Sequence, residues 1–186
     1  MLNKKVLLLF GLIFLLFLAC NSSKVKNENS VYVMIYDFEN KPVKGTSFFL
    51  DGKLLGNSDI NGRFIFELND TEKHTILLKH DEYEPIEDTV VYEKFLVLYY
   101  KVGNVTQLLN LAEKELDLKK YEKAMEFINR AEKIDSTRED VLYLKAVIYY
   151  KSKDYESAKK EINKITITKE NQKYISELKK RIENEN

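Results

Sequence analysis

Few residues in this sequence combine a reactive side chain with a spacing that suits chemistry, and the two histidines come first. His74 and His80 are the only histidines in the chain. On a β-strand their even separation would place both imidazoles on one face. A zinc site needs further cysteine, histidine or carboxylate ligands at motif spacing, and none accompanies this pair. We therefore predict surface or edge-strand histidines, and neither a metal nor a cofactor.

A second candidate is the segment 57–62 (NSDING), which matches the first half of a calcium-binding loop. The full loop requires a bidentate Glu at its twelfth position. That position holds Leu68, and Glu67 stands one residue short. A β-rich segment follows instead of a helix. The sequence therefore favours a β-turn in which Gly62 has a positive φ.

The signatures of common enzymes are missing from the sequence. It contains no G-x-S-x-G, no H-E-x-x-H, no P-loop and no G-x-G-x-x-G. Acidic pairs such as Glu87-Asp88 are ordinary in a chain with 32% charged residues and indicate a solvated face. Charges of both signs alternate without a basic stripe, which argues against nucleic acid as a partner. We predict no catalytic residue, no enzymatic activity and no small-molecule substrate.

Cys20 is the only cysteine, and its surroundings predict a covalent modification. The chain begins with a basic pair, Lys4-Lys5, and continues with an apolar run from Val6 to Phe17. This run is shorter than the roughly 20 residues of a transmembrane helix. It has the length of the apolar part of a signal peptide. A single cysteine in an exported protein cannot form an internal disulfide, so its presence needs another explanation.

The segment Phe17-Leu18-Ala19-Cys20 resembles the lipobox of bacterial lipoproteins, although Phe17 stands where Leu is most common. The resemblance implies that residues 1–19 are a lipoprotein signal peptide and that Cys20 is lipidated, for example with palmitate. It also implies a protein of the bacterial envelope, at the outer membrane or cell surface rather than the inner membrane. The alternative is a plain secretory signal, or an uncleaved anchor, followed by an incidental cysteine.

The rest of the chain divides by composition. Residues 20–30 comprise Cys20 and a polar stretch that we expect to form a flexible tether. Residues 31–102 carry short runs of β-forming residues between turn signals such as Asp51-Gly52, which predicts a small antiparallel β-sandwich. The segment 63–68 (RFIFEL) alternates polar and apolar residues, so one of its faces is predicted to be buried.

The β-rich part resembles two related small modules, the PEGA domain and the carboxypeptidase regulatory-like sandwich. The resemblance rests on the segments 40–45 (NKPVKG), 49–53 (FLDGK) and 55–64 (LGNSDINGRF). Asn40 stands where Gly is common, and Ser58 replaces Thr. Modules of this kind imply binding or spacing rather than catalysis.

After Gly103 the apolar residues follow a period of about 3.6, which predicts helices to the C-terminus. The pair Asn104 and Gln107 has a capping-box pattern, and so does the pair Ser136 and Glu139. Residues also recur at an offset of 34, which indicates an internal repeat. The recurring pairs are Leu108/Leu142, Ala112/Ala146, Tyr121/Tyr155, Ala124/Ala158 and Ile128/Ile162.

This repeat resembles the tetratricopeptide repeat. Tyr121, Ala124, Ile128 and Ala131 occupy the family's aromatic, small, bulky and small positions. The resemblance implies that residues 103–186 contain two repeats of paired helices, at about 105–138 and 139–172. A capping helix is expected over about 169–183, with one apolar face formed by Tyr174, Ile175, Leu178 and Ile182.

In this family, positions on the first helix of each repeat line a groove that holds an extended peptide or a helix. The resemblance assigns to such a groove Leu109, Glu113, Leu116, Tyr143, Val147, Tyr150 and Lys151. The groove could instead be filled by the C-terminal helix or by the β-rich part.

The expected fold class is α+β, with a small β-sandwich followed by a helical repeat array. The favoured function is that of a membrane-anchored envelope lipoprotein that binds a protein partner through its repeats. Two alternatives remain at this point. One is a surface protein that binds glycan or host matrix through the β-rich part, and the other is an accessory subunit of an outer-membrane assembly complex.

Overall fold

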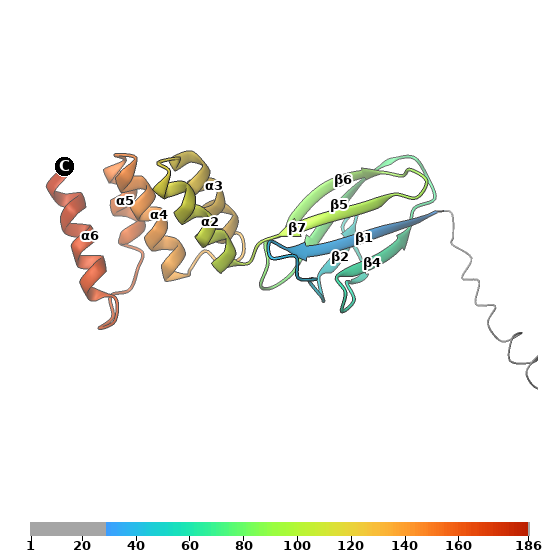
Figure 1. The fold of residues 1–186 in the computed structure, drawn as a ribbon, viewed down its shortest axis with the longest axis horizontal. Helices are drawn as coiled ribbons and strands as arrows, with labels where there is room; N and C mark the ends of the chain where they lie inside the picture. The colour runs from blue at the N-terminus through green and yellow to red at the C-terminus, as the bar shows by residue number, and fades with distance from the viewer. Residues whose placement is uncertain (1–28, 186) are drawn as a thin grey trace, which may run out of the picture.

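A computed structural model describes residues 29–185, which form a β module followed by a helical array (Figure 1). The strands of the β module are β1 (Ser30–Asp37), β2 (Ser47–Leu50), β3 (Lys53–Asn57), β4 (Arg63–Glu67), β5 (Lys73–Lys79), β6 (Ile86–Val91) and β7 (Val97–Val102). The helices of the array are α2 (Val105–Asp117), α3 (Tyr121–Glu132), α4 (Glu139–Lys151), α5 (Tyr155–Ile162) and α6 (Gln172–Glu185). This arrangement has the predicted α+β class.

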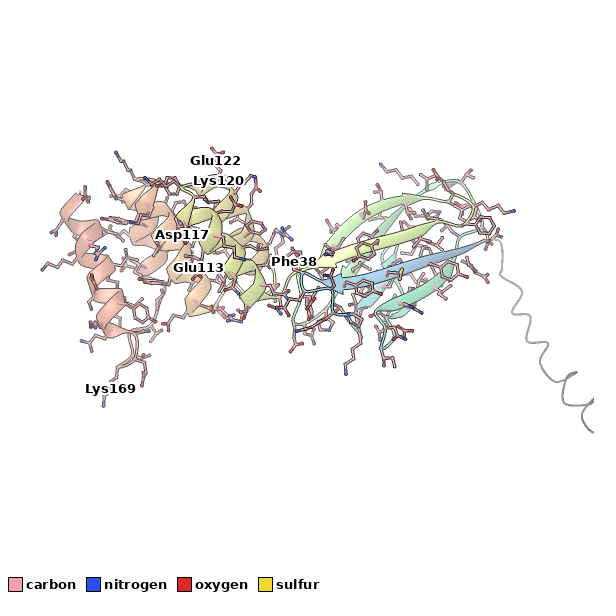
Figure 2. All side chains as sticks on the ribbon, viewed as in Figure 1. Phe38, Glu113, Asp117, Lys120, Glu122 and Lys169 are labelled. Carbon is pink, nitrogen blue, oxygen red and sulfur yellow. The ribbon has the colours of Figure 1, made fainter. Side chains whose placement is uncertain are left out.

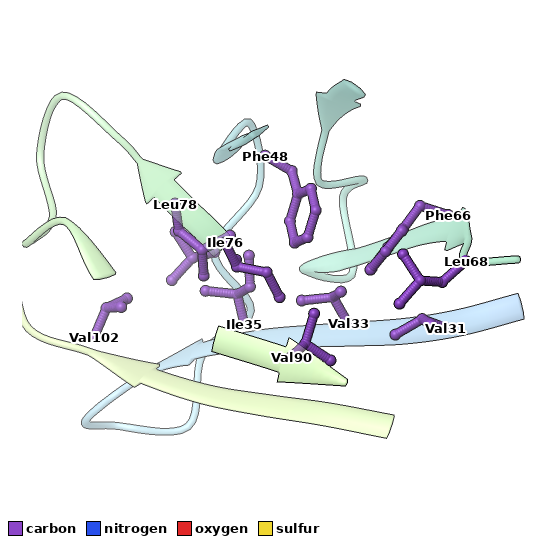
Figure 3. Close-up of a cluster of buried hydrophobic side chains, with 11 residues drawn as sticks. Val31, Val33, Ile35, Phe48, Phe66, Leu68, Ile76, Leu78, Val90 and Val102 are labelled. Atoms are coloured by element: carbon purple, nitrogen blue, oxygen red, sulfur yellow. The ribbon is translucent and has the colours of Figure 1, made fainter. Parts of the chain in front are cut away.

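Two sheets enclose the core of the β module, one with strand order β4-β1-β7 and the other with order β3-β2-β5-β6. Successive side chains of a strand point to opposite faces. In β1, Val31, Val33 and Ile35 are therefore buried, while Tyr32 and Met34 on the other face remain partly exposed. The core between the sheets also contains Val43, Phe48, Phe66, Leu68, Ile76, Leu78, Val90 and Val102 (Figure 3).

One strand pairing corrects the predicted antiparallel sandwich. The strands β1 and β7 are parallel neighbours, with Tyr32 opposite Val97 and Asp37 opposite Val102. Parallel pairing requires a long connection, and here the rest of the module supplies it. The chain consequently enters β1 at one end of the module and leaves β7 at the opposite end, where the helices begin (Figure 1).

The acidic turn before β4 has the predicted geometry. The Asp59 Oδ1 atom accepts hydrogen bonds from the N–H groups of Asn61 and Arg63, both at 2.8 Å. These bonds, the one from Arg63 first, hold the pKa of Asp59 below its usual value. Gly62 has a φ of 70°, and a Cβ there would lie 2.3 Å from the carbonyl oxygen of Ile35. The turn thus requires Gly62, as the sequence predicts.

In the helical array, α2 pairs with α3, α4 pairs with α5, and α6 packs against the second pair (Figure 1). The small residues of the 34-residue period, Ala112, Ala124, Ala146 and Ala158, are fully buried. Their size allows the helix backbones to approach closely. Within residues 29–185 no helix is both long enough and apolar enough to span a bilayer.

The two predicted capping boxes have different outcomes. The Asn104 side chain accepts the Gln107 N–H at 2.9 Å, and the Gln107 side chain accepts the Asn104 N–H at 3.3 Å, so α2 begins as predicted. The second box is wrong, because α4 begins after Arg138, which makes no side-chain capping bond. The carboxylate of Asp135 instead accepts both the N–H and the hydroxyl of Thr137.

An ion pair between a buried carboxylate and a partly exposed arginine joins the β module to the helical array. The Glu84 side chain, only 5% exposed, accepts hydrogen bonds from Arg130 at 2.6 and 2.7 Å and from the Gly103 N–H at 2.7 Å. The Arg130 guanidinium lies 5.4 Å from the ring of Phe38 and 5.3 Å from that of Phe127. Phe38 extends from the β module into the core of the first repeat (Figure 2). These contacts fix the junction.

Candidate partner-binding groove

Two adjoining hollows cross the helical array, and together we call them the groove. Both are lined by Tyr143 of α4 and Tyr174 of α6. The first hollow, about 560 Å³, extends from α4 toward α2, and Glu113 is one of its lining residues. The second hollow, about 200 Å³, lies between α4 and α6. Its other lining residues are Val147, Tyr150, Lys151, Glu177, Leu178 and Arg181.

Six of the seven residues assigned to the groove line it. Glu113 and Tyr143 lie on the first hollow together with Leu109, which also belongs to the core of the first repeat. The remaining three residues, which follow Tyr143 on α4, line the second hollow. They are Val147, Tyr150 and Lys151. The seventh residue, Leu116, lines neither hollow. It packs half-buried against the first-repeat core, two helical turns after Leu109 on α2.

The contribution of α6 to the groove was missed. Its apolar face was predicted to include Tyr174, but the structure buries Ile175 and Ile182 and leaves Tyr174 38% exposed on the groove. The 34-residue period gives no signal here. Extended past α5, it would place Ser176 and Lys180 where the second repeat has Leu142 and Ala146.

Contacts with α4 fix α6 as a wall of the groove. The Tyr174 hydroxyl donates to one oxygen of Glu139, and the other oxygen accepts the Asn171 Nδ2 at 2.9 Å. The hydrogen bond to the carboxylate raises the pKa of Tyr174 to about 12, so the phenol keeps its proton at neutral pH. The Tyr174 ring meets that of Tyr143 edge-on, with centroids 5.0 Å apart. The C-terminal helix therefore lines the groove and leaves both hollows open.

Charged side chains surround the aromatic floor. Arg138 pairs with Asp140, and Arg181 pairs with Glu177, each at 2.5 Å. Burial raises the pKa of Tyr143, so that phenol also remains neutral. The groove thus presents neutral aromatic rings and aliphatic side chains with charges at its rim. Such a surface suits the side chains of a protein segment.

The histidines do not form a shared site. His74 lies between two carboxylates, with Nδ1 2.6 Å from Asp51 and Nε2 2.8 Å from Asp70. These hydrogen bonds raise the pKa of His74 and lower the pKa values of both aspartates. His80 lies beyond the end of β5, where its Nδ1 accepts the Glu82 N–H at 3.0 Å. In the described part of the chain, no three histidine, cysteine or acidic residues gather as a metal site requires.

The remaining sequence predictions fall outside the described residues. The signal peptide at 1–19, the lipidation of Cys20 and most of the tether at 20–30 belong to this group. The described chain begins at Asn29, and β1 already includes Ser30. The strand therefore starts one residue before the boundary expected at Val31.

Comparisons with known proteins address mainly the helices. Residues 115–182 match the family model for the tetratricopeptide repeat. No curated protein matches the chain. Among solved structures, the chain is similar to the Bacillus anthracis TIE protein, with 14% identity over 41% of this chain and 16% of that one (TM-score 0.34).

A second similar structure is a Streptococcal ancillary pilin, with 12% identity over 43% of this chain and 33% of that one (TM-score 0.34). The matches therefore span about a sixth and a third of those two proteins. Likenesses of this size say nothing about function. The family match carries more weight, since it covers the region in which the 34-residue period was found. The match supports a tetratricopeptide repeat within residues 115–182.

Proposed function

We propose that this protein is a lipoprotein of the bacterial envelope, held on the outer membrane or cell surface by lipid on Cys20. In this proposal it recruits a protein partner in the groove and performs no catalysis. The tetratricopeptide repeats support the role in protein interaction. The lipobox resemblance of residues 17–20 supports the anchor.

The observation that carries the proposal is the open row of tyrosines along the groove. Tyr143, Tyr150 and Tyr174 all line it, and their rings are held in place by neighbours before any partner arrives. Tyrosines are enriched among residues that dominate binding energy at protein interfaces. Side chains already fixed lose little conformational entropy on binding. The groove is therefore prepared to bind.

The exposed charges at the rim of the groove suggest which charges the bound segment carries at each end. Glu113 lies on the α2 side of the groove and Lys151 at the C-terminal end of α4. Both side chains are exposed, and neither forms an ion pair within residues 29–185. Complementary charges at an interface fix the register of the partner. We expect the bound segment to carry a basic residue near α2 and an acidic residue near Lys151.

In the same proposal the β module is a spacer. The parallel pairing of β1 and β7 puts the start of the module and the start of the helices at opposite ends. The Glu84–Arg130 ion pair keeps the two parts in a fixed arrangement. The resemblance to PEGA modules agrees with this role. The module would hold the groove away from the membrane surface.

The test begins with crosslinking in intact cells and identification of the crosslinked protein by mass spectrometry. The affinity of that protein is then measured for the soluble form that begins at Ser22. Truncation of a central interface tyrosine typically costs about 2 kcal/mol or more. We therefore expect Tyr150→Ala to weaken binding about 30-fold.

Tyr149→Ala is the matched control for this measurement. Tyr149 is also half-buried on α4 and, like Tyr150, packs against the second-repeat core, but it lines neither hollow. The control variant should bind as tightly as the unaltered protein. Equal affinities of all three proteins would exclude the groove as the binding site. The anchor is tested separately, by loss of metabolic labelling with a palmitate analogue in Cys20→Ala.

A further inference from the structure

The end of the β module farthest from the helices is the end at which the chain enters β1 (Figure 1). The carbonyl oxygen of Asn29 accepts the N–H of Leu68 at 3.0 Å, and the N–H of Tyr32 donates to the carbonyl oxygen of Leu96 at 3.0 Å. The β4–β5 and β6–β7 loops therefore flank the start of β1. We call this end of the module the tip.

Large apolar side chains are exposed at the tip. Phe95 is 62% exposed, Ile65 56%, Val97 55% and Val91 47%. On the outer face of the three-stranded sheet, Tyr32 lies directly between Ile65 and Val97 in the strand register. Single exposed apolar residues are common, but several at one end of a module mark a surface that contacts something else.

Phe95 is the most exposed member of this group, and its setting is unusual. Its φ is 65°, a left-handed conformation that a bulky side chain rarely adopts. The ammonium group of Lys94 lies 5.3 Å from the centre of its ring. Segments that enter the boundary between lipid headgroups and acyl chains combine apolar side chains such as Phe with Lys or Arg.

The short length of chain between Cys20 and the tip points to a bilayer as the occupant. Cys20 precedes Asn29 by nine residues, which span at most about 30 Å when extended. A lipid on Cys20 would keep the tip within that distance of the bilayer and raise its effective concentration there. This step rests on the anchor of the proposed function.

The charges at the tip indicate how the contact would be made. Glu93 is followed by Lys94, and Glu72 is followed by Lys73. The β4–β5 loop also carries Asp70, so acidic residues outnumber basic ones and the tip has no excess of basic residues to attract anionic lipid. Burial of apolar side chains would therefore provide the attraction, and zwitterionic lipid would suffice.

We propose that the tip is a membrane-contacting surface, in which Phe95 and Val97 enter the headgroup region of the bilayer that holds the lipid of Cys20. This contact orients the β module with its long direction away from the bilayer. The groove then faces the space beyond the membrane at the far end of the molecule.

The absence of tryptophan from the sequence allows a direct test. In Phe95→Trp the new indole is the only one in the chain and reports on its own surroundings. The mature chain from Cys20 is coupled through its thiol to maleimide-headgroup lipid in phosphatidylcholine vesicles. We expect the tryptophan emission to shift to the blue and to be quenched by brominated phosphatidylcholine. Added phosphatidylglycerol should change neither result.

Ile60→Trp is the matched control. Ile60 is 79% exposed and lies in the turn before β4, toward the end of β1 that leads to the helices. Its emission should stay unshifted and unquenched on the same vesicles. Val97→Trp is a second reporter at the tip in case Phe95→Trp does not fold, as judged by circular dichroism. Identical, water-like emission from tip and control reporters on vesicles would overturn the proposal.

Two further outcomes would assign the tip to another occupant. A blue shift that appears without vesicles and grows with protein concentration would indicate a second copy of the chain. A blue shift produced by soluble envelope glycan alone would indicate a carbohydrate. Because the vesicle coupling is chemical, a failure of the tip to insert is distinct from a failure of Cys20 lipidation in cells. For the uncoupled protein, Phe95→Ser should lower partition into vesicles about ten-fold.

Discussion

The β module and the helical array stabilise their backbones in different ways. In the β module, neighbouring strands come from distant parts of the chain, since β1 pairs with both β4 and β7. Aspartate side chains fix its turns, as Asp59 does before β4. In the helical array, each helix packs mainly on the next one along the chain. Small residues such as Ala112 and Ala146 set the spacing there.

This difference explains why the helical array offers the better binding surface. Each helix pair completes its core with its own residues and those of the next pair, so one face of α4 remains open as the groove. The β module uses both sheets to enclose a single core. What it leaves exposed are its ends and outer faces. In the proposed function, the helical array therefore holds the partner and the β module sets its distance from the membrane.

The largest expected effect is a loss of stability confined to the β module. Phe48 is fully buried, with ring centroids 4.9 Å from those of Phe64 and Phe66. Phe48→Ala should lower the free energy of unfolding of the β module by about 3–5 kcal/mol. In this variant, the helices should therefore unfold at a higher urea concentration than the β module, as measured at equilibrium by the helical circular dichroism. Phe95→Ala, at an exposed site, should change stability by less than about 0.5 kcal/mol. One shared transition would show instead that both parts unfold as a unit.

The second prediction concerns the boundary between the two regions. Arg130→Ala removes the cation that compensates Glu84, whose side chain is 5% exposed. An uncompensated buried carboxylate destabilises a protein by about 3 kcal/mol. We expect this loss in urea unfolding, together with a wider distribution of distances between spin labels on the β module and α5. Arg181→Ala is the control, because its pair with Glu177 is exposed and contributes less than about 1 kcal/mol. Unchanged distances in Arg130→Ala would show that the junction is fixed by other contacts.

The sequence was more informative for the helical array than for the β module. The 34-residue offset identified both helix pairs, and Asn104 correctly marked the start of α2. A repeat is visible in the sequence because equivalent buried positions of the two helix pairs carry residues of similar size. The contribution of α6 to the groove was missed, since the residue 34 positions before Tyr174 is Asp140 and the period therefore predicts no aromatic ring there.

In the β module, local patterns predicted the turns but not the pairing of strands. The alternation in β4 correctly predicted one buried face, and the structure shows that this face carries Phe66. The parallel pairing of β1 with β7 depends on the whole module and has no local signature. The strand β3 (Lys53–Asn57) was also not predicted, because it is short and mostly exposed. Side chains from distant turns, such as Asp51 and Asp70, meet at His74 only once the sheet has formed.

The smallest predicted effect on stability comes from the bridge of His74 with Asp51 and Asp70, and it should be confined to the β module. Both carboxylates are about half exposed, so the bridge contributes less than a buried pair would. The pKa of folded His74 is raised above the ordinary 6.5, and the pKa values of Asp51 and Asp70 are lowered below 3.8. The bridge therefore contributes fully between pH 3.8 and pH 6.5. Its contribution is lost as the pH rises through the raised value of His74, or falls through the lowered values of the aspartates.

Urea unfolding of the unaltered protein and of His74→Gln should consequently differ most inside that window. The difference should shrink when the pH is raised well above the imidazole range. In the double variant Asp51→Asn, Asp70→Asn, the effect of His74→Gln should be small at every pH, since the imidazolium has no carboxylate partner there. If the stability difference between the unaltered protein and His74→Gln were constant with pH, His74 would stabilise the β module by packing rather than by charge. The helical array holds no histidine, so its own unfolding should show no dependence on this imidazole.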